Sequence, residues 1–296
     1  MCGHTSVVLR PRILLASASC LRSLMTGQRY SEWSATTNGW DTARIIPRSW
    51  TNAWIALCIS GHFRDFEVAW PSLKKHVIDV YDPDVFAHAW NDSFGHFMHA
   101  KDKHHPSFDL GYDPSSKQVP SNYANSVAAR LQPKAFKLQD PTTIKQLVDQ
   151  LAEANKPFES SWEWHRPRPK YQMIYGKTQA IKLKRQYEQL HGFKYDRVIY
   201  TRWDIVHEAA LPSWAVADYR LLIPSRYSYV GPADIWASGS SEQLDIYGDM
   251  LDQLPDVRQT PDFCTDPHLW LNSHLIYNRV DFVLCDVPVM IANRIF

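Results

Sequence analysis

The sequence predicts a single α/β domain built on a mixed, mostly parallel sheet with helices on its flanks. A continuous apolar run at 54–59 predicts a buried strand, and Asp84–Trp90 predicts the next one. Between them an apolar repeat at near-helical spacing follows Pro71, a residue that suits the first turn of a helix. A strand, a helix and a strand within about forty residues form a βαβ unit, and such units build parallel sheets.

A second helix–strand unit follows later in the chain. The segment Tyr171–Leu190 predicts the longest helix, and Gly192 is a suitable terminator for it. The helix leads directly into a strand within Tyr195–Ile205. Three basic residues are predicted to lie on the solvated face of this helix: Lys182, Lys184 and Arg185.

Shorter elements complete the predicted domain. Helices are predicted to begin at Pro141, at the capping box Ser240-Ser241-Glu242-Gln243 and at the N-cap Asp266 followed by Pro267. Further strands are predicted at 220–224, 234–239 and 281–291. The polar stretch 91–140 has no clear period and predicts an insertion or lid, and 157–170 predicts an ordered loop.

The folded domain is expected to span residues 51–296, preceded by a poorly ordered leader at 1–50. Residues 1–31 contain no acidic residue, and two arginines precede a weak apolar patch at 13–18. This pattern is similar to that of a targeting peptide. A disordered leader or an upstream start codon would explain the same pattern.

Composition argues against several classes of function. The formal net charge of +1 over 296 residues gives no support for a nucleic-acid partner. No apolar run approaches the roughly 18–20 residues that a membrane span needs. The five cysteines form no Cys-X-X-Cys pair, which argues against a zinc knuckle or a disulfide framework. Their number and spacing favour a reducing compartment, and the expected location is the cytoplasm.

Residues with useful chemistry follow the predicted strands at their carboxyl ends, where open α/β sheets bind ligands. Arg202 and Asp204 end the later strand, and the alternative reading is a surface ion pair beside a core strand. Ser60, Gly61 and Arg64 follow the first strand, where a glycine lets a ligand approach the backbone closely. The alternative for these residues is an ordinary turn between a strand and a helix.

Four short motifs occur in a suggestive order and spacing. They are Ser60-Gly61-His62-Phe63-Arg64, Phe86-Ala87-His88-Ala89-Trp90, Tyr195-Asp196-Arg197-Val198-Ile199-Tyr200-Thr201-Arg202-Trp203-Asp204, and Asp234-Ile235-Trp236 before a short helix. In this order the chain resembles the small GT-A-type glycosyltransferases of large algal viruses and of bacterial surface-polysaccharide loci. The resemblance covers about residues 54–290 and excludes the leader.

The resemblance implies a Rossmann-like, GT-A-type domain that binds a nucleotide-diphosphate sugar, UDP-linked, together with Mn²⁺ or Mg²⁺. It places Ser60, Gly61 and Arg64 at the nucleotide and Asp204 at the metal motif. With these four, His88, Lys177 and Arg202 complete the seven residues predicted to bind the donor. Asp204 would be the second acid of the family's Asp-X-Asp metal motif, but Arg202 stands in place of the first acid. Either one carboxylate holds the metal with the diphosphate and waters, or Arg202 takes over part of the role of the cation.

Sugar transfer needs positive charge beside the leaving diphosphate and a base for the incoming hydroxyl. Arg64, Lys177, Arg202 or a metal on Asp204 could supply the charge. Asp234 is the predicted base because it opens an apolar strand, and a plain turn acid is the alternative. An in-line attack assisted by Asp234 would invert the anomeric centre.

Two histidines could add a metal ligand near the end of the domain, namely His268 and His274. For either one the alternative is a histidine with a purely structural role. The first of them follows the predicted N-cap Asp266 by two residues, and the second lies further along the same predicted helix.

The function that the resemblance implies is transfer of a sugar, with xylose among the candidate donors, to a glycan hydroxyl. The acceptor would be a glycan on a capsid or surface glycoprotein, and a viral enzyme would act in the host cytoplasm. A non-catalytic carbohydrate-binding protein on the same fold is the alternative, since the first acid is missing and Trp and Tyr are abundant. Another nucleotide-dependent transferase, such as a sulfotransferase, is less favoured because the phosphate-loop motif is absent.

Overall fold

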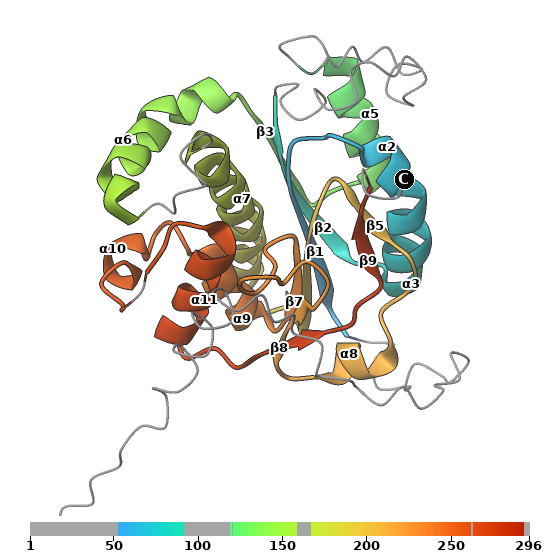
Figure 1. The fold of residues 1–296 in the computed structure, drawn as a ribbon. Coiled ribbons are helices and arrows are strands. Elements are labelled where there is room, and N and C mark those ends of the chain that lie inside the picture. The colour runs from blue at the N-terminus through green and yellow to red at the C-terminus, as the bar shows by residue number, and fades with distance from the viewer. Residues whose placement is uncertain (1–52, 92–118, 120, 159–166, 262, 293–296) are drawn as a thin grey trace, which may run out of the picture. The chain divides into compact units, whose positions relative to one another are not determined.

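The computed structural model describes residues 53–91, 119, 121–158, 167–261 and 263–292. Within these residues the chain forms an α/β fold with a seven-stranded, mostly parallel sheet flanked by helices, as the sequence predicts (Figure 1). The predicted leader at 1–50 lies outside the described residues, and so does the first part of the predicted insertion.

The strand order of the sheet in the described part of the chain is β3-β2-β1-β4-β7-β6-β8. The strands are β1 (Ile55–Gly61), β2 (Asp84–Trp90), β3 (Ala135–Gln139), β4 (Arg197–Arg202), β6 (Leu221–Pro224), β7 (Trp236–Gly239) and β8 (Phe282–Cys285). The first four strands pair in parallel, whereas β7 runs antiparallel to both β4 and β6. A separate antiparallel pair joins β5 (Ile205–His207) to β9 (Val289–Ile291).

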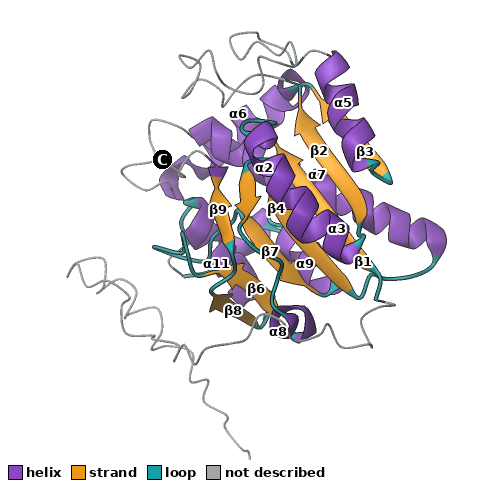
Figure 2. Ribbon diagram, turned by 90° about the vertical axis from the view of Figure 1, so that its right-hand side faces the viewer, coloured by secondary structure: helices purple, strands orange, loops and turns teal. Residues whose placement is uncertain are grey.

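Helices cover both faces of the sheet (Figure 2). In this view α2 (Phe66–Leu73), α3 (Asp79–Tyr81) and α5 (Ser121–Leu131) lie in front of the sheet, and α7 (Pro167–His191) passes behind it and packs on β1 and β2. The remaining helices are α6 (Lys145–Asn155), α8 (Ser213–Ala217), α9 (Ser241–Gly248), α10 (Leu254–Val257) and α11 (Pro267–Tyr277). Because β1, β2 and β4 are covered on both faces, their sequences are nearly continuous apolar runs.

Several predicted helix boundaries are confirmed. α7 ends at His191, and Gly192 follows it with a φ of +70°, a left-handed conformation that favours glycine. Ser240 and Gln243 form the predicted capping box at the start of α9. Asp266 caps α11, and its side chain accepts hydrogen bonds from two backbone N–H groups of the first turn.

Pro71 lies inside α2, so its predicted place in the first turn of a helix was wrong. The helix begins earlier, at Phe66, because the carbonyl of Asp65 accepts a hydrogen bond from the backbone N–H of Ala69. Pro71 has no N–H with which to continue this pattern, and the chain widens into a π-helical stretch, η2, at Lys74–Ile78.

Two predicted segments differ from the observed elements. The final strand predicted at 281–291 is two strands, β8 and β9, which belong to different sheets. The polar stretch 91–140 contains α5 and β3, which the sequence did not predict. β3 is the edge strand of the sheet and has no fully buried residue, so its sequence lacks the apolar run that marks an inner strand.

The prediction that Lys184 lies on a solvated face was wrong, because its side chain is fully buried between α7 and α9. Its Nζ lies 3.0 Å from an oxygen of Glu188 and 2.9 Å from an oxygen of Asp245. Nζ also donates a hydrogen bond to Ser241, and Glu188 accepts one from the backbone N–H of Tyr195. Two carboxylates therefore compensate the buried ammonium, and the group joins α7, α9 and the approach to β4.

The packing of α7 on α9 depends on the absence of a side chain at Gly248. A Cβ added there would lie 2.9 Å from Cδ1 and 3.0 Å from Cβ of Ile181. Gly248→Ala is therefore expected to lower the free energy of unfolding by about 1–3 kcal/mol, as overpacked cores do. Urea unfolding followed by circular dichroism measures this change.

A double-mutant cycle with Ile181→Ala is the control for this prediction. Removing the Ile181 branches is expected to recover part of the loss caused by Gly248→Ala, giving a coupling free energy of about 0.5 kcal/mol or more. Strictly additive effects of the two substitutions would contradict the proposed contact.

Candidate active site

The candidate site lies where the order of the strands reverses. From β1 the chain proceeds outward to β2 and β3, and then crosses back to β4 on the other side of β1. In the register of the sheet, Ser60 at the end of β1 lies opposite His88 on one side and Arg202 on the other. Such switch points leave a crevice at the carboxyl ends of the strands, which is where open α/β sheets bind ligands.

A small pocket of about 30 Å³ occupies this switch point. It is lined by Ser60, Gly61, His62, Arg64, Met173, Tyr200, Arg202 and Asp204. The structure thus brings together five of the seven residues that the sequence predicted at a donor. It leaves His88 and Lys177 outside the lining, and it adds three residues that were not predicted there: His62, Met173 and Tyr200.

One carboxylate and two guanidiniums form the charged centre of the pocket. Arg202 makes a two-pronged contact with Asp204, in which Nε lies 2.9 Å from Oδ1 and Nη2 donates to Oδ2. Nη1 of Arg64 lies 3.4 Å from the same Oδ2. The side chain of Asp204 is 1% exposed, whereas 15% of Arg202 and 33% of Arg64 face solvent. The three groups carry one net positive charge, which favours an anionic ligand.

The electrostatics of this group keep Asp204 ionised. Burial alone would raise the pKa of Asp204, but the charges of Arg202 and Arg64 and the hydrogen bond from Arg202 outweigh it and lower the pKa. Burial alone would likewise lower the pKa of Arg202, and Asp204 raises it instead. All three groups are therefore charged at neutral pH.

Backbone geometry and packing fix these side chains. Gly61 has a φ of +115° and Arg64 a φ of +26°, so the segment after β1 turns through conformations that side chains disfavour. Trp203 is buried, and its Nε1 donates a 3.1 Å hydrogen bond to the carbonyl of His88. The backbone N–H of Ala292 donates to the carbonyl of Asp204 at 2.8 Å. The strand end that carries Arg202 and Asp204 is thus held from both sides.

Lys177 lies behind the pocket in a cage of apolar groups. It is one helical turn after Met173 on α7 and is fully buried. Its Nζ lies 4.3 Å from the ring centre of Tyr247, 5.7 Å from that of Tyr200 and 3.5 Å from the sulfur of Met250. Burial lowers the pKa of Lys177 to about 8, although the charge of Asp234 acts in the opposite direction.

Asp234 lies at the same edge of the sheet as Arg202 and Asp204. It precedes β7 by two residues, and Trp236, the first residue of that antiparallel strand, pairs with Thr201 near the carboxyl end of β4. The Asp234 side chain is 5% exposed, and its Oδ1 lies 3.8 Å from Nε2 of His268. Its other oxygen, Oδ2, is buried and accepts no hydrogen bond from the described residues.

Hydrogen bonds of Ser228 and close packing at Gly231 hold the loop that carries Asp234 in place. Ser228 Oγ donates to the carbonyl of Pro224 at 2.6 Å and accepts from the backbone N–H of Ala233 at 2.9 Å. Gly231 lies against the first turn of α11, where an added Cβ would come within 2.6 Å of the carbonyl oxygen of His268. The pairing of Asp234 with His268 thus follows from close backbone packing between a loop and a helix.

Two other predicted residues do not line the pocket. His88 is buried with Nε2 3.2 Å from Oε1 of Gln139, and burial lowers its pKa to about 3. His274 is buried on α11, with Nε2 2.6 Å from the carbonyl oxygen of Ile246, and burial lowers its pKa to about 4. Both are neutral near pH 7, and each has one ring nitrogen engaged by the protein.

The described residues at the pocket do not fit a divalent cation in this arrangement. Asp204 is the carboxylate among the lining residues, and both of its oxygens already face a guanidinium. His268 lies at Asp234, and Nε2 of His274 is occupied by a carbonyl. No group of three His, Cys, Asp or Glu side chains suited to a metal occurs in the part of the chain that the structure describes. The predicted Mn²⁺ or Mg²⁺ stays a prediction.

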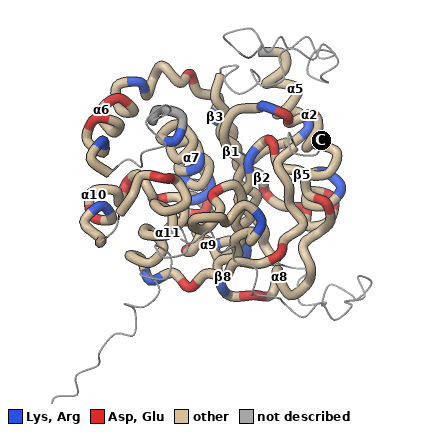
Figure 3. Tube along the Cα trace, in the orientation of Figure 1, with Lys and Arg blue, Asp and Glu red and all other residues tan. Residues whose placement is uncertain are grey.

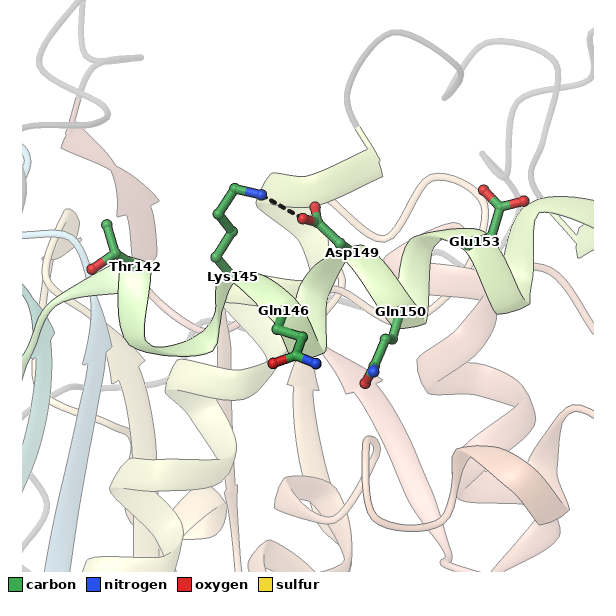
Figure 4. A pocket seen from close by; sticks show the side chains of 6 residues that line it. All are labelled: Thr142, Lys145, Gln146, Asp149, Gln150 and Glu153. Atoms are coloured by element: carbon green, nitrogen blue, oxygen red, sulfur yellow. Dashed lines mark hydrogen bonds and ion pairs between the residues drawn. The ribbon is translucent and has the colours of Figure 1, made fainter.

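A second hollow lies along the outer side of α6 (Figure 4). Its lining comes from that helix and the turn before it: Thr142, Lys145, Gln146, Asp149, Gln150 and Glu153. Lys145 and Asp149 form an exposed ion pair at 2.6 Å. We give this hollow no functional role because it is open and its side chains do not converge from several elements.

Charge elsewhere in the described chain is mixed. Basic and acidic positions are interspersed over its helices and strands, so the positive excess at the pocket is local (Figure 3). None of the described helices combines the length and the apolar composition needed to cross a membrane.

Asp204→Ala is expected to lower the free energy of unfolding at neutral pH by about 3–5 kcal/mol, because Arg202 would stay buried without a counter-charge. The pKa of Asp204 is lowered in the folded protein, so its contribution is present above the ordinary aspartate pKa. That contribution is lost as the pH falls through the lowered value. The difference between wild type and variant should therefore shrink under acid conditions.

Urea unfolding at several pH values measures this difference. Asp79→Ala is the matched control, because Asp79 pairs with Lys74 in an ion pair whose side chains are about half exposed. Removing such a pair is expected to cost about 1 kcal/mol or less. A loss for Asp204→Ala no greater than that of the control would contradict the structural role of the buried group.

Lys177→Met is expected to raise the free energy of unfolding near neutral pH by up to about 3 kcal/mol, because the buried ammonium disappears. The pKa of Lys177 is lowered from 10.5 to about 8, so the penalty for burying its charge is full below about pH 8. The penalty vanishes as the pH approaches 10.5. The gain should therefore shrink over that range.

Paired unfolding curves for wild type and variant between neutral pH and about pH 10 test this, since other titrations cancel in the difference. Lys182→Met, on the same helix but in a partly exposed ion pair with Asp252, is the control and should show no such pH dependence. A Lys177→Met variant that is destabilised to the same extent at every pH would contradict the prediction.

No protein-family model matches this sequence, and a search of curated proteins found no match either. A functional assignment therefore depends on the pocket at the switch point and on the buried carboxylate of Asp234 beside it.

Proposed function

We propose that this protein is a glycosyltransferase that moves a sugar from a nucleotide-diphosphate donor to a hydroxyl of a glycan. The observation that carries the proposal is the pair of arginines over one buried carboxylate at the switch point of the sheet. An anionic, phosphate-containing ligand suits this group, and a nearby carboxylate with an unengaged oxygen suits a proton acceptor. The resemblance of the four sequence motifs to GT-A-type enzymes supports the same reaction.

The arginines would bind the diphosphate of the donor. Guanidinium groups fit phosphate oxygens with two parallel hydrogen bonds, and they carry their charge at any physiological pH. The pocket of about 30 Å³ has room for a small group rather than a whole nucleotide. In this proposal the diphosphate meets Arg64 and Arg202 at the pocket, and the remainder of the donor extends outward.

The reaction breaks the bond between the sugar C1 and the diphosphate oxygen and forms a bond from C1 to the acceptor oxygen. The electron pair of the broken bond stays on the diphosphate, where Arg64 and Arg202 stabilise the added negative charge. Oδ2 of Asp234 accepts the proton of the attacking hydroxyl. An attack from the face opposite the leaving group gives an inverted anomeric centre.

Lys177 has an indirect part in this proposal. It does not line the pocket, but its ammonium lies 5.7 Å from the ring centre of Tyr200, which does line it. The charges of Lys177 and Asp234 also attract one another. A buried cation without a contacting carboxylate destabilises a fold, so its presence beside two candidate site residues supports a functional role.

The substrate identities follow from the resemblance alone. UDP is the proposed nucleotide, and xylose is one candidate for the sugar. The proposed acceptor is a glycan carried by a capsid or surface glycoprotein. The proposed location, from the cysteine usage, is the cytoplasm, or that of the host if the protein is viral. The alternative is a carbohydrate-binding protein without catalysis, which would bind ligand and show no turnover.

Asp234→Asn is expected to lower the transfer rate by about 10²–10⁴-fold, because an amide cannot take the proton of the acceptor hydroxyl. Donor binding should stay within about threefold of wild type, a difference below 1 kcal/mol. Donor hydrolysis and transfer are measured across a panel of nucleotide sugars, and donor affinity is measured by calorimetry.

Asp256→Asn is the control, because Asp256 is exposed on α10. It should behave like wild type in both assays. Near-normal turnover by Asp234→Asn would rule out Asp234 as the base, and ligand binding by the wild type without any turnover would favour the carbohydrate-binding alternative.

A further inference from the structure

We infer that Arg64 and Arg202 take the place of a divalent cation, so that a nucleoside diphosphate binds this site without Mn²⁺ or Mg²⁺. The inference rests on the proposed function, since it concerns the donor of that reaction. It differs from the metal-dependent site that the sequence motifs imply, and it follows from how Asp204 is engaged in the structure.

The ligand atoms of Asp204 are already engaged. Oδ1 accepts a hydrogen bond from Nε of Arg202, and Oδ2 lies within 3.4 Å of Nη1 of Arg64 and also contacts Nη2 of Arg202. A divalent cation bound by one carboxylate would have to displace these contacts from a side chain that is 1% exposed. The guanidinium of Arg202, whose side chain is only 15% exposed, would then lose its counter-charge, which is strongly unfavourable.

The sign of the charge selects the ligand. Two guanidiniums and one carboxylate leave a positive excess at the pocket, so an approaching divalent cation is repelled and a diphosphate is attracted. Outside the lining, Lys177 and Asp234 carry opposite charges, and the charge of Asp65 also acts on Arg64, so the positive excess belongs to the three groups that line the pocket. The pocket therefore presents to a diphosphate the positive charge that a metal ion supplies in two-acid sites.

Both arginines keep N–H groups that can donate hydrogen bonds to phosphate oxygens. Arg202 uses Nε and Nη2 on Asp204, and within the described residues its Nη1 makes no hydrogen bond. Arg64 uses Nη1 on Asp204, and a third of its side chain is exposed. Asp204 thus orients two guanidiniums that line the pocket and keep N–H groups that are not used on Asp204. Hydrogen bonds from such charged groups to phosphate oxygens are strong.

Calorimetric titration of the full chain with UDP, GDP and inorganic pyrophosphate tests the inference, once in EDTA and once in Mn²⁺. The expected result is that a nucleoside diphosphate binds in EDTA with a Kd within about threefold of that in Mn²⁺. Binding that is weaker by about tenfold or more in EDTA would overturn the inference and leave the proposed function standing. Absence of binding to any nucleotide under both conditions would overturn both.

Arg202→Lys sharpens the test, because it keeps the charge and removes the planar fork. Affinity for the nucleoside diphosphate in EDTA should fall by about tenfold or more. Arg220→Lys is the matched control: Arg220 makes the same two-pronged contact with Asp218, with Nε 3.0 Å from Oδ1 and Nη2 2.7 Å from Oδ2. That pair precedes β6, which runs parallel to β4, so it lies at the opposite edge of the sheet.

Thermal unfolding without ligand separates a binding effect from loss of structure. Arg202→Lys and Arg220→Lys should show comparable melting temperatures without ligand. Only Arg202→Lys should bind the nucleoside diphosphate more weakly than wild type. Equal diphosphate affinities of the two variants in EDTA would overturn the role assigned to Arg202.

Discussion

The charged group formed by Asp204, Arg202 and Arg64 is the constraint around which the switch point is built. A carboxylate that is 1% exposed is tolerable because two guanidiniums surround it, and Arg202 is tolerable at its depth because of Asp204. The group can form because parallel pairing aligns the ends of β1 and β4, and because Trp203 fixes the strand end against β2. The ion pairs of Asp204 thus depend on the pairing of β1 with β4 and on the packing of Trp203.

Two lysines of α7, Lys184 and Lys177, are fully buried, and their surroundings differ. Lys184 is buried among two carboxylates and a hydroxyl, and it joins helices, so its charge is explained by structure alone. Lys177 lies two turns before Lys184 on the same side of α7, with two aromatic rings and a thioether around its ammonium. The two lysines thus differ in how their buried charge is compensated: carboxylates contact Lys184, whereas aromatic rings contact Lys177.

The sequence was sufficient for the inner strands and for the residues at their ends, because a buried parallel strand is a continuous apolar run and its carboxyl end faces the crevice. β3 escaped detection because an edge strand without buried residues has no such run. The burial of Lys184 could not be read from its own helix, since its partners Ser241 and Asp245 come from α9. Tyr200 was accessible to the same reasoning, because alternation places it on the face of β4 that carries Arg202.

The reversal of β7 explains why the candidate base comes from a distant part of the chain. In a fully parallel sheet, the residues that precede a strand lie at the edge away from the crevice. Because β7 runs antiparallel to β4, the residues before it, including Asp234, lie at the crevice edge instead. One antiparallel strand therefore adds a carboxylate with an unengaged oxygen to a site whose own carboxylate is committed to two arginines. In the proposed reaction a single acid in the strand motif is sufficient, because Asp204 orients the two arginines and Asp234, which has different neighbours, would accept the proton.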